Sequence, residues 1–243
     1  MDAGRKAVGT ALRRASPPGV SKQEAIRAAV TDYIVANSMP AGALLPTELV
    51  LMDELGVGRN ALREAMKALE ALGIVQIRHG FGTYVGNATL AALESGLRFR
   101  TEKSLHTDLS EIRNLLDVRE VLEVGLASRV VSAVAPSDLA LLDDIVDRME
   151  STAAGGEYFP ALDWQFHEAL YVPLGNALIV DLLRVFWQVF SQVDAELPGA
   201  RYAPAIAVQW HRDILDAIHA GDGSAASGAM GAHFSGIRGR LEV

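Results

Sequence analysis

The 243-residue sequence contains no cysteine. This absence excludes disulfides and thiolate metal sites and makes a reducing cytoplasm the expected compartment.

Aromatic residues make up only 6% of a chain that is 50% hydrophobic, so its apolar content is mainly alanine, leucine and valine, which favours helices over β-sandwiches. The most apolar stretch, 177–190, is interrupted by Asp181 and Arg184. Because a membrane helix needs roughly 18 apolar residues, and the basic N-terminus has no signal-peptide apolar run, we expect a soluble cytoplasmic protein.

Acidic residues outnumber basic ones, and the net charge is −8. The excess is confined to one part of the chain: residues 1–86 hold 10 Lys and Arg against 8 Asp and Glu, whereas residues 87–243 hold 12 against 22. Any binding to nucleic acid must therefore depend on a local basic face in the first part.

The first part of the chain shows the order of a winged helix-turn-helix domain over residues 21–87, preceded by a flexible tail, residues 1–20. Apolar periodicity predicts helices at 22–37, 47–55 and 59–72, with Ser21 and Thr47 as N-terminal caps. Two short apolar runs, 74–77 and 83–85, flank a glycine-containing turn and predict a β-hairpin. The residues that the third helix turns inward are predicted to be Leu62, Ala65, Met66, Leu69 and Leu72.

From residue 88 onward strand signals are absent. Helical segments are predicted at about 88–100, 108–133, 137–153, 158–172, 177–195, 205–220 and 222–240, separated by proline and glycine, and Asn176 is a suitable cap for the fifth. We therefore predict a mainly α protein, with an all-α helical bundle over residues 88–243 following the winged domain.

The third helix has the composition of a DNA-reading helix. Arg59 and Arg63 are four residues apart, so they share a face opposite the apolar stripe. Arginine can hold guanine, and asparagine adenine, through two hydrogen bonds each. The alternative is a solvated face paired with Glu64 and Glu70. The DNA-binding residues predicted on this helix and at the hairpin tip are Arg59, Asn60, Arg63, Lys67, Arg78, His79 and Gly80.

This region resembles the DNA-binding domain of the GntR family. The resemblance covers about residues 22–86 and implies that Arg59 and Arg63 contact bases and that His79-Gly80 reaches the minor groove. Two positions depart from the family pattern: Leu49 stands where an arginine is usual, and Gly58 where serine or threonine is frequent. The segments that carry the resemblance are Leu45-Pro46-Thr47-Glu48, Val57 to Ala65, Leu69-Glu70-Ala71-Leu72-Gly73 and His79-Gly80-Phe81-Gly82-Thr83-Tyr84-Val85.

Three histidines and one aspartate lie on apolar stripes of the second domain. Asp163 and His167 are four residues apart and share a helix face, while His211 and His233 belong to the last two predicted helices. Neutral imidazoles with one carboxylate suit zinc first, and also nickel, manganese or iron. Each histidine taken alone is better explained as a core residue, and only the four positions together favour a metal site.

The same segment, about residues 95–240, resembles the FCD domain of FadR-type GntR regulators. In that domain an aspartate, a histidine four residues later and two histidines on the last two helices hold a metal, and Asp163, His167, His211 and His233 match these positions. His106 and His219 match none, and we expect them at the surface.

Arg119 interrupts an apolar stripe of the helix predicted at 108–133. A charge that faces the core needs an anion. That anion is either a buried carboxylate such as Glu123 or the carboxylate of a bound metabolite, gripped through two hydrogen bonds. The FCD resemblance implies the metabolite.

Together these patterns predict a homodimeric, ligand-responsive transcriptional regulator, with repressor implied by the resemblance. Two winged domains would bind palindromic double-stranded DNA, and a small organic or sugar acid would bind at the metal and Arg119. Two alternatives stay open: a metalloenzyme that uses the Asp/His site, and a purely structural metal without an effector.

Overall fold

The computed structural model describes residues 21–199 and 201–241. Contacts within the chain divide it into two compact units between Ala92 and Leu93, a short distance beyond the predicted boundary at residue 87. The predicted flexible tail, residues 1–20, lies outside the described residues.

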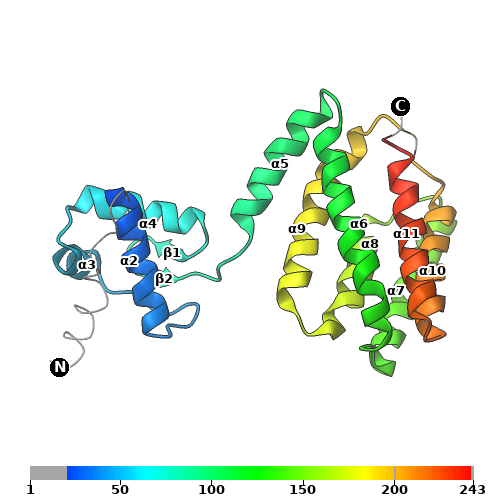
Figure 1. Ribbon diagram of the computed structural model, residues 1–243, viewed down its shortest axis with the longest axis horizontal. Helices are drawn as coiled ribbons and strands as arrows, with labels where there is room; N and C mark the ends of the chain where they lie inside the picture. Colours follow the sequence, from blue (N-terminus) through cyan, green and yellow to red (C-terminus); the bar gives the residue numbers. More distant parts are fainter. Residues whose placement is uncertain (1–20, 200, 242–243) are drawn as a thin grey trace. The chain divides into compact units, whose positions relative to one another are not determined.

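The first unit contains three helices and a hairpin (Figure 1): α2 (Lys22–Ala36), α3 (Glu48–Leu55), α4 (Arg59–Ala71), β1 (Val75–Arg78) and β2 (Gly82–Val85). The predicted caps are present, since Ser21 Oγ accepts the Glu24 amide at 3.2 Å and Thr47 Oγ1 accepts the Val50 amide at 3.4 Å. Gly56 ends α3 in the left-handed conformation, which glycine adopts without steric cost. The predicted winged helix-turn-helix order is confirmed.

The apolar faces of these helices form the core of the first unit. Helices α2 and α4 pack against each other, and the α4 stripe is buried as predicted except for Leu72, which is 47% exposed. The prediction for Leu72 was wrong because α4 ends at Ala71 and Leu72 is its C-terminal cap. The buried residues of this core are Ile26, Val30, Tyr33, Ile34, Leu45, Leu51, Leu62, Ala65, Met66, Leu69, Val75 and Val85.

The hairpin is antiparallel, with Val75 opposite Val85 and Arg78 opposite Gly82. The segment before α3 joins it: Leu44 forms a bridge with Tyr84, and the Leu45 amide donates to the Thr83 carbonyl at 2.8 Å. The wing is thereby tied to the chain that enters the helix-turn-helix.

The second unit is helical in every regular element that the structure describes. Its helices are α5 (Ala91–Leu105), α6 (Ser110–Val131), α7 (Pro136–Ala154), α8 (Pro160–Tyr171), α9 (Ala177–Val193), α10 (Pro204–His219) and α11 (Gly223–Arg238), with 3-10 turns η1 (Val172–Leu174) and η2 (Asp194–Glu196). The predicted all-α bundle is confirmed. The helix predicted at 88–100 runs instead from Ala91 to Leu105.

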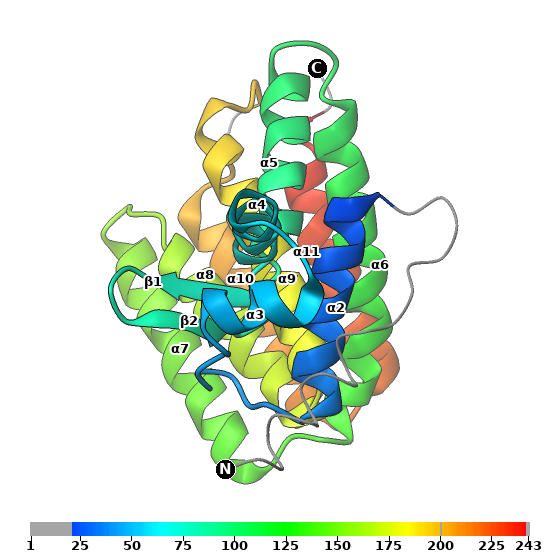
Figure 2. The ribbon, with the colours of Figure 1, turned by 90° about the vertical axis from the view of Figure 1, so that its left-hand side faces the viewer.

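Helices α6 and α11 lie side by side in both views (Figures 1 and 2), and α10 packs against both α11 and α7. Helix α8 is flanked by α7 and α9. Helix α6 contacts α8, α10 and α11, so these three helices surround it in one region of the bundle. None of the described helices has the length and apolarity that crossing a membrane requires.

Candidate DNA-binding and metal-binding sites

All seven residues predicted to bind DNA are exposed in the first unit. Gly58 occupies the N-cap of α4 and, lacking a side chain, leaves the first amides of the helix without a side-chain cap. Such amides can donate hydrogen bonds to a phosphate. The exposed set divides between helix α4, with Arg59, Asn60, Arg63 and Lys67, and the wing, with Arg78, His79 and Gly80.

The ion pairs on this face differ from the pairing considered from sequence. Arg63 Nε lies 3.1 Å from Glu48 of α3, and Lys67 Nζ lies 3.1 Å from Glu64. Glu70 instead accepts the Ile77 amide of the wing at 2.9 Å. Exposed ion pairs contribute about 1 kcal/mol or less, so a phosphate or a base can replace Glu48 at Arg63.

The tip of the wing is held by side-chain contacts along its outer face. Arg78 donates to Gln76 Oε1 at 2.8 and 3.0 Å, and its guanidinium lies 4.4 Å from the centre of the Tyr84 ring. Gly80 has φ +80°, a conformation that favours glycine. His79 and Arg78 are thus presented at an ordered tip.

The second unit brings the four predicted metal ligands together. Helix α8 supplies Asp163 and His167, α10 supplies His211, and α11 supplies His233. One ligand atom from each lies within 4.8 Å of all the others. A metal with bonds of 2.0–2.2 Å holds its ligand atoms roughly 3–4 Å apart, so a small side-chain adjustment would close the four around one ion.

The hydrogen bonds of His211 point to a cation at this place. Its Nδ1 lies 2.7 Å from the Ala207 carbonyl oxygen, which can only accept, so Nδ1 carries the proton. Nε2 lies 2.9 Å from Asp163 Oδ1. A ring protonated on both nitrogens donates to this oxygen, whereas a neutral ring presents a lone pair to it. At this distance the two atoms need either a proton or a metal ion between them.

The other two histidines have unused nitrogens. His167 Nδ1 lies 2.5 Å from Glu123 Oε2, which leaves Nε2 without a hydrogen-bond partner among the described residues, and neither ring nitrogen of His233 has one. Both side chains are buried. A buried polar atom without a partner costs about 1–3 kcal/mol, and a metal ion would satisfy one nitrogen of each ring.

The electrostatics of the cluster keep Asp163 ionised and His233 neutral. Burial raises the pKa of Asp163, but the hydrogen bond to His211 and the nearby imidazoles outweigh it and hold that pKa well below the usual range. Burial lowers the pKa of His233, and the other two histidines lower it further. These are the protonation states that metal coordination requires.

Arg119 is buried, and its partner is the carboxylate predicted as one of two alternatives: Arg119 Nε donates to Glu123 Oε1 at 2.5 Å. Tyr171 donates to the other oxygen of Glu123 at 3.1 Å. Burial raises the pKa of Glu123, but Arg119 and then His167 lower it to about 2. Glu123 thus contacts both Arg119 and the Nδ1 atom of His167, one of the candidate metal ligands.

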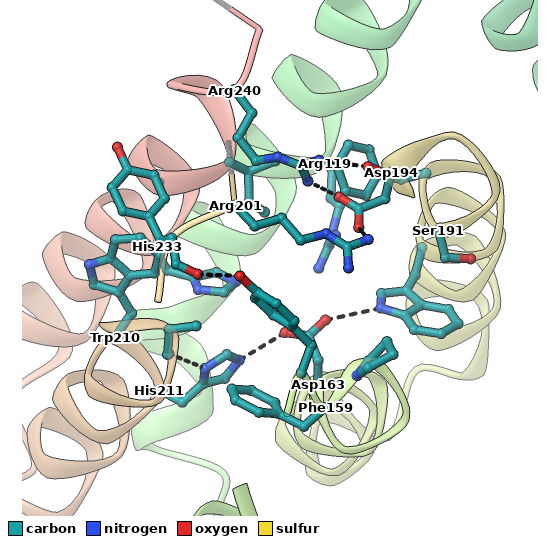
Figure 3. A pocket seen from close by; sticks show the side chains of 18 residues that line it. Arg119, Phe159, Asp163, Ser191, Asp194, Arg201, Trp210, His211, His233 and Arg240 are labelled. Carbon is teal, nitrogen blue, oxygen red and sulfur yellow. Dashed lines mark hydrogen bonds and ion pairs between the residues drawn. The ribbon is translucent and has the colours of Figure 1, made fainter. Parts of the chain in front are cut away.

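A cavity of about 250 Å³ opens in front of the cluster, and Arg119 lines it together with Asp163, His211 and His233 (Figure 3). Arg201, Arg240 and Asp194 lie across the cavity from Asp163 and His211 in that view. Its remaining surface is largely aromatic, formed by Tyr158, Phe159, Trp187, Phe190, Tyr202 and Trp210.

Several cavity residues were missed from sequence. Trp187 donates to Asp163 Oδ2 at 3.0 Å and so orients a candidate ligand, and its place in the apolar pattern of α9 carried no sign of this. Arg201 and Arg240 follow no helical periodicity that leads to the cavity. His106 and His219 are exposed, as predicted, and His219 lies 3.1 Å from Asp143.

Comparison with protein families decides the class of this protein. Residues 22–85 match the model of "Bacterial regulatory proteins, gntR family", and residues 114–236 match that of the FCD domain. The chain belongs to the GntR family. It is a transcriptional regulator with a winged helix-turn-helix and an FCD ligand-binding domain, and the metalloenzyme alternative falls because the matched family consists of regulators.

Individual relatives of this GntR protein are regulators as well. It is 29% identical to the transcriptional regulator LutR of Bacillus subtilis over 83% of this chain and 92% of that protein. It is 25% identical to the galactonate operon transcriptional repressor of Escherichia coli, over 86% and 92% of the two chains. Among solved structures, GntR of Streptococcus agalactiae superposes with a TM-score of 0.65 and 27% identity, covering 89% of this chain and 98% of that one.

Proposed function

We propose that this GntR regulator is a homodimeric repressor that binds a palindromic operator. Its second unit would bind one divalent metal ion and a small organic or sugar acid, and binding of the acid would release the protein from the operator. The ion, zinc first among the candidates, would be held by Asp163, His167, His211 and His233. When bound it would supply positive charge and a coordination position for an acid group. Arg119, which lines the same cavity, would bind the acid from the side.

The observation that carries the proposal is the convergence of one carboxylate and three buried imidazoles beside the cavity. His211 Nε2 and Asp163 Oδ1 lie 2.9 Å apart and need a proton or a metal ion between them. Among the described residues, His167 Nε2 and both ring nitrogens of His233 are buried without hydrogen-bond partners. A structural metal alone would not need a cavity lined with aromatic side chains and arginine. Cavities of this composition are typical of small-molecule sites.

The names of the relatives support two parts of the proposal: that the protein is a repressor, and that its effector is an acid. The Escherichia coli relative is named as a repressor of the galactonate operon, and galactonate is a sugar acid. Repressor activity and the FadR-type assignment rest on this similarity and on the residues described above.

Metal analysis of protein purified without chelators tests the first step. Four ligands predict about one ion per chain, and His211→Ala should lose it, whereas His219→Ala, at the exposed histidine, should retain it. Absence of metal in the wild type, with no uptake on titration, would contradict the proposal. If chelation lowers the melting temperature but no acid alters operator affinity, the metal is structural only.

The DNA-binding half of the proposal is tested separately at α4. Duplexes selected from a random pool provide the operator, and Arg63→Ala should weaken its binding about 10- to 100-fold and relax one base preference. Arg148→Ala, which removes an exposed arginine of the second unit paired with Asp144, should bind like wild type. An unchanged sequence preference in Arg63→Ala would overturn the assignment of α4 as the recognition helix.

A further inference from the structure

Arg201 stands in the chain between η2 and α10 and lines the cavity. Its Nη2 donates to Asp194, its guanidinium lies 5.1 Å from the centre of the Tyr158 ring, and its side chain is 38% exposed. Among the described residues, its Nε and Nη1 have no hydrogen-bond partner. Arg201 therefore keeps donors available to a ligand.

Arg240 contacts the same carboxylate, Asp194, that holds Arg201. This arginine is nearly buried and donates to the side chain of Asp194, to the Asp194 carbonyl and to the Gly199 carbonyl. Asp194 is thus held in place by Arg240 and in turn positions Arg201. The pair of arginines around one carboxylate leaves one positive charge at this end of the cavity.

Charge balance then separates two kinds of acid. At the inner end, Arg119 is neutralised by Glu123, and a divalent ion beside Asp163 leaves one positive charge. At the outer end, Arg201 and Arg240 exceed Asp194 by one positive charge. An acid with a single carboxylate balances the inner end only, whereas an acid with two balances both.

We propose that the effector carries two acid groups, one bound at the metal and Arg119 and the other at Arg201, with its stem against the aromatic walls. The chemical class is a short dicarboxylic acid, either a hydroxy diacid or an aldaric acid. This inference rests on the proposed function, since it assigns the second contact of the same effector. Arg201 is its specificity-determining residue.

Calorimetric titration of the full-length, zinc-loaded protein with matched acids tests the proposal. Lactate with malate, butyrate with succinate and galactonate with galactarate each differ at the end of the molecule by one carboxylate. A charge-assisted hydrogen bond predicts that, where binding occurs, the diacid binds about 10- to 100-fold more tightly. Arg201→Gln should reduce this preference to within about threefold while zinc content and the affinity for the monoacid stay unchanged, and Arg148→Gln should keep the preference.

The outcomes separate this inference from the proposed function. Equal or tighter binding of the monoacid in every pair that binds, or a diacid preference that survives Arg201→Gln, overturns the role of Arg201 and leaves an acid-responsive regulator. If neither acid of any pair binds the zinc-loaded protein, the proposed effector function fails, and the second acid site fails with it.

Discussion

Replacing Glu123 with glutamine should strongly destabilise the second unit. Glu123 and Arg119 are buried, with side-chain exposures of 1% and 3%, and their ion pair is 2.5 Å long. The amide of glutamine has nearly the same shape but no charge, so Arg119 would stay buried without a counter-ion. Glutamine therefore tests the charge and not the packing.

Two independent estimates give the size of the effect. Removal of one partner from a buried ion pair costs about 3–5 kcal/mol in unfolding free energy. The pKa of Glu123, about 2 against a usual value of 4.5, corresponds to about 3 kcal/mol at neutral pH, because each unit is worth about 1.4 kcal/mol. We expect a loss of about 3 kcal/mol.

Urea unfolding followed by tryptophan fluorescence provides the assay. The three tryptophans, Trp164, Trp187 and Trp210, all belong to the second unit, so the signal does not report the winged domain. Metal-free protein avoids coupling to the ion. Arg148→Gln, at an exposed pair, should cost about 1 kcal/mol or less. If Glu123→Gln loses no more than this control, the buried pair is not the electrostatic support described here.

Three further predictions concern other parts of the chain. Gly58→Ser should slow hydrogen exchange of the first α4 amides by stabilising the helix by about 0.5 kcal/mol, because a Cβ there meets nothing within 4 Å; unchanged exchange would contradict this. The unfolding free energy of metal-free protein should decrease as pH falls below about 6.5, by up to about 1.4 kcal/mol per pH unit from one group. The reason is that burial lowers the pKa of His233 in the folded protein, so that only the unfolded chain binds a proton there. His233→Gln should make the unfolding free energy less dependent on pH, and a slope identical to wild type would refute the assignment. Gly236→Ala should weaken acid binding with zinc content unchanged, because its Cβ would lie 2.0 Å from the ring of Trp210 and displace this cavity-lining side chain. Wild-type affinity for the acid in a titration would contradict a role for Trp210 in acid binding.

Features that repeat along one helix were predictable from sequence. The four-residue spacing of Asp163 and His167 places them on one face of α8, and the apolar stripe of α4 separates its core from Arg59 and Arg63. Capping by Ser21 and Thr47 was predictable for the same reason, since it depends on residues within one turn. Resemblance to the GntR and FCD patterns then related helices that are distant in sequence.

Features that depend on the packing of separate segments were not predictable. The pairing of Arg63 with Glu48 depends on how α3 and α4 are set against each other by the turn at Gly56. Arg201 reaches the cavity from a connecting segment without periodicity, and Arg240 does so from just beyond the last helix. Leu72 was misassigned because one residue beyond the end of a helix no longer follows its periodicity.

Operator affinity in the presence of acid tests the central claim most directly. Fluorescence anisotropy of a selected duplex should be measured with zinc-loaded wild type and with His211→Ala, each with and without the acid that most raises the melting temperature. Coupling of about 1–3 kcal/mol predicts that the acid raises the Kd of the wild type for DNA about 5- to 150-fold and leaves that of His211→Ala unchanged. A wild-type Kd that does not respond to an acid bound in the cavity would contradict control of the winged domain by this site.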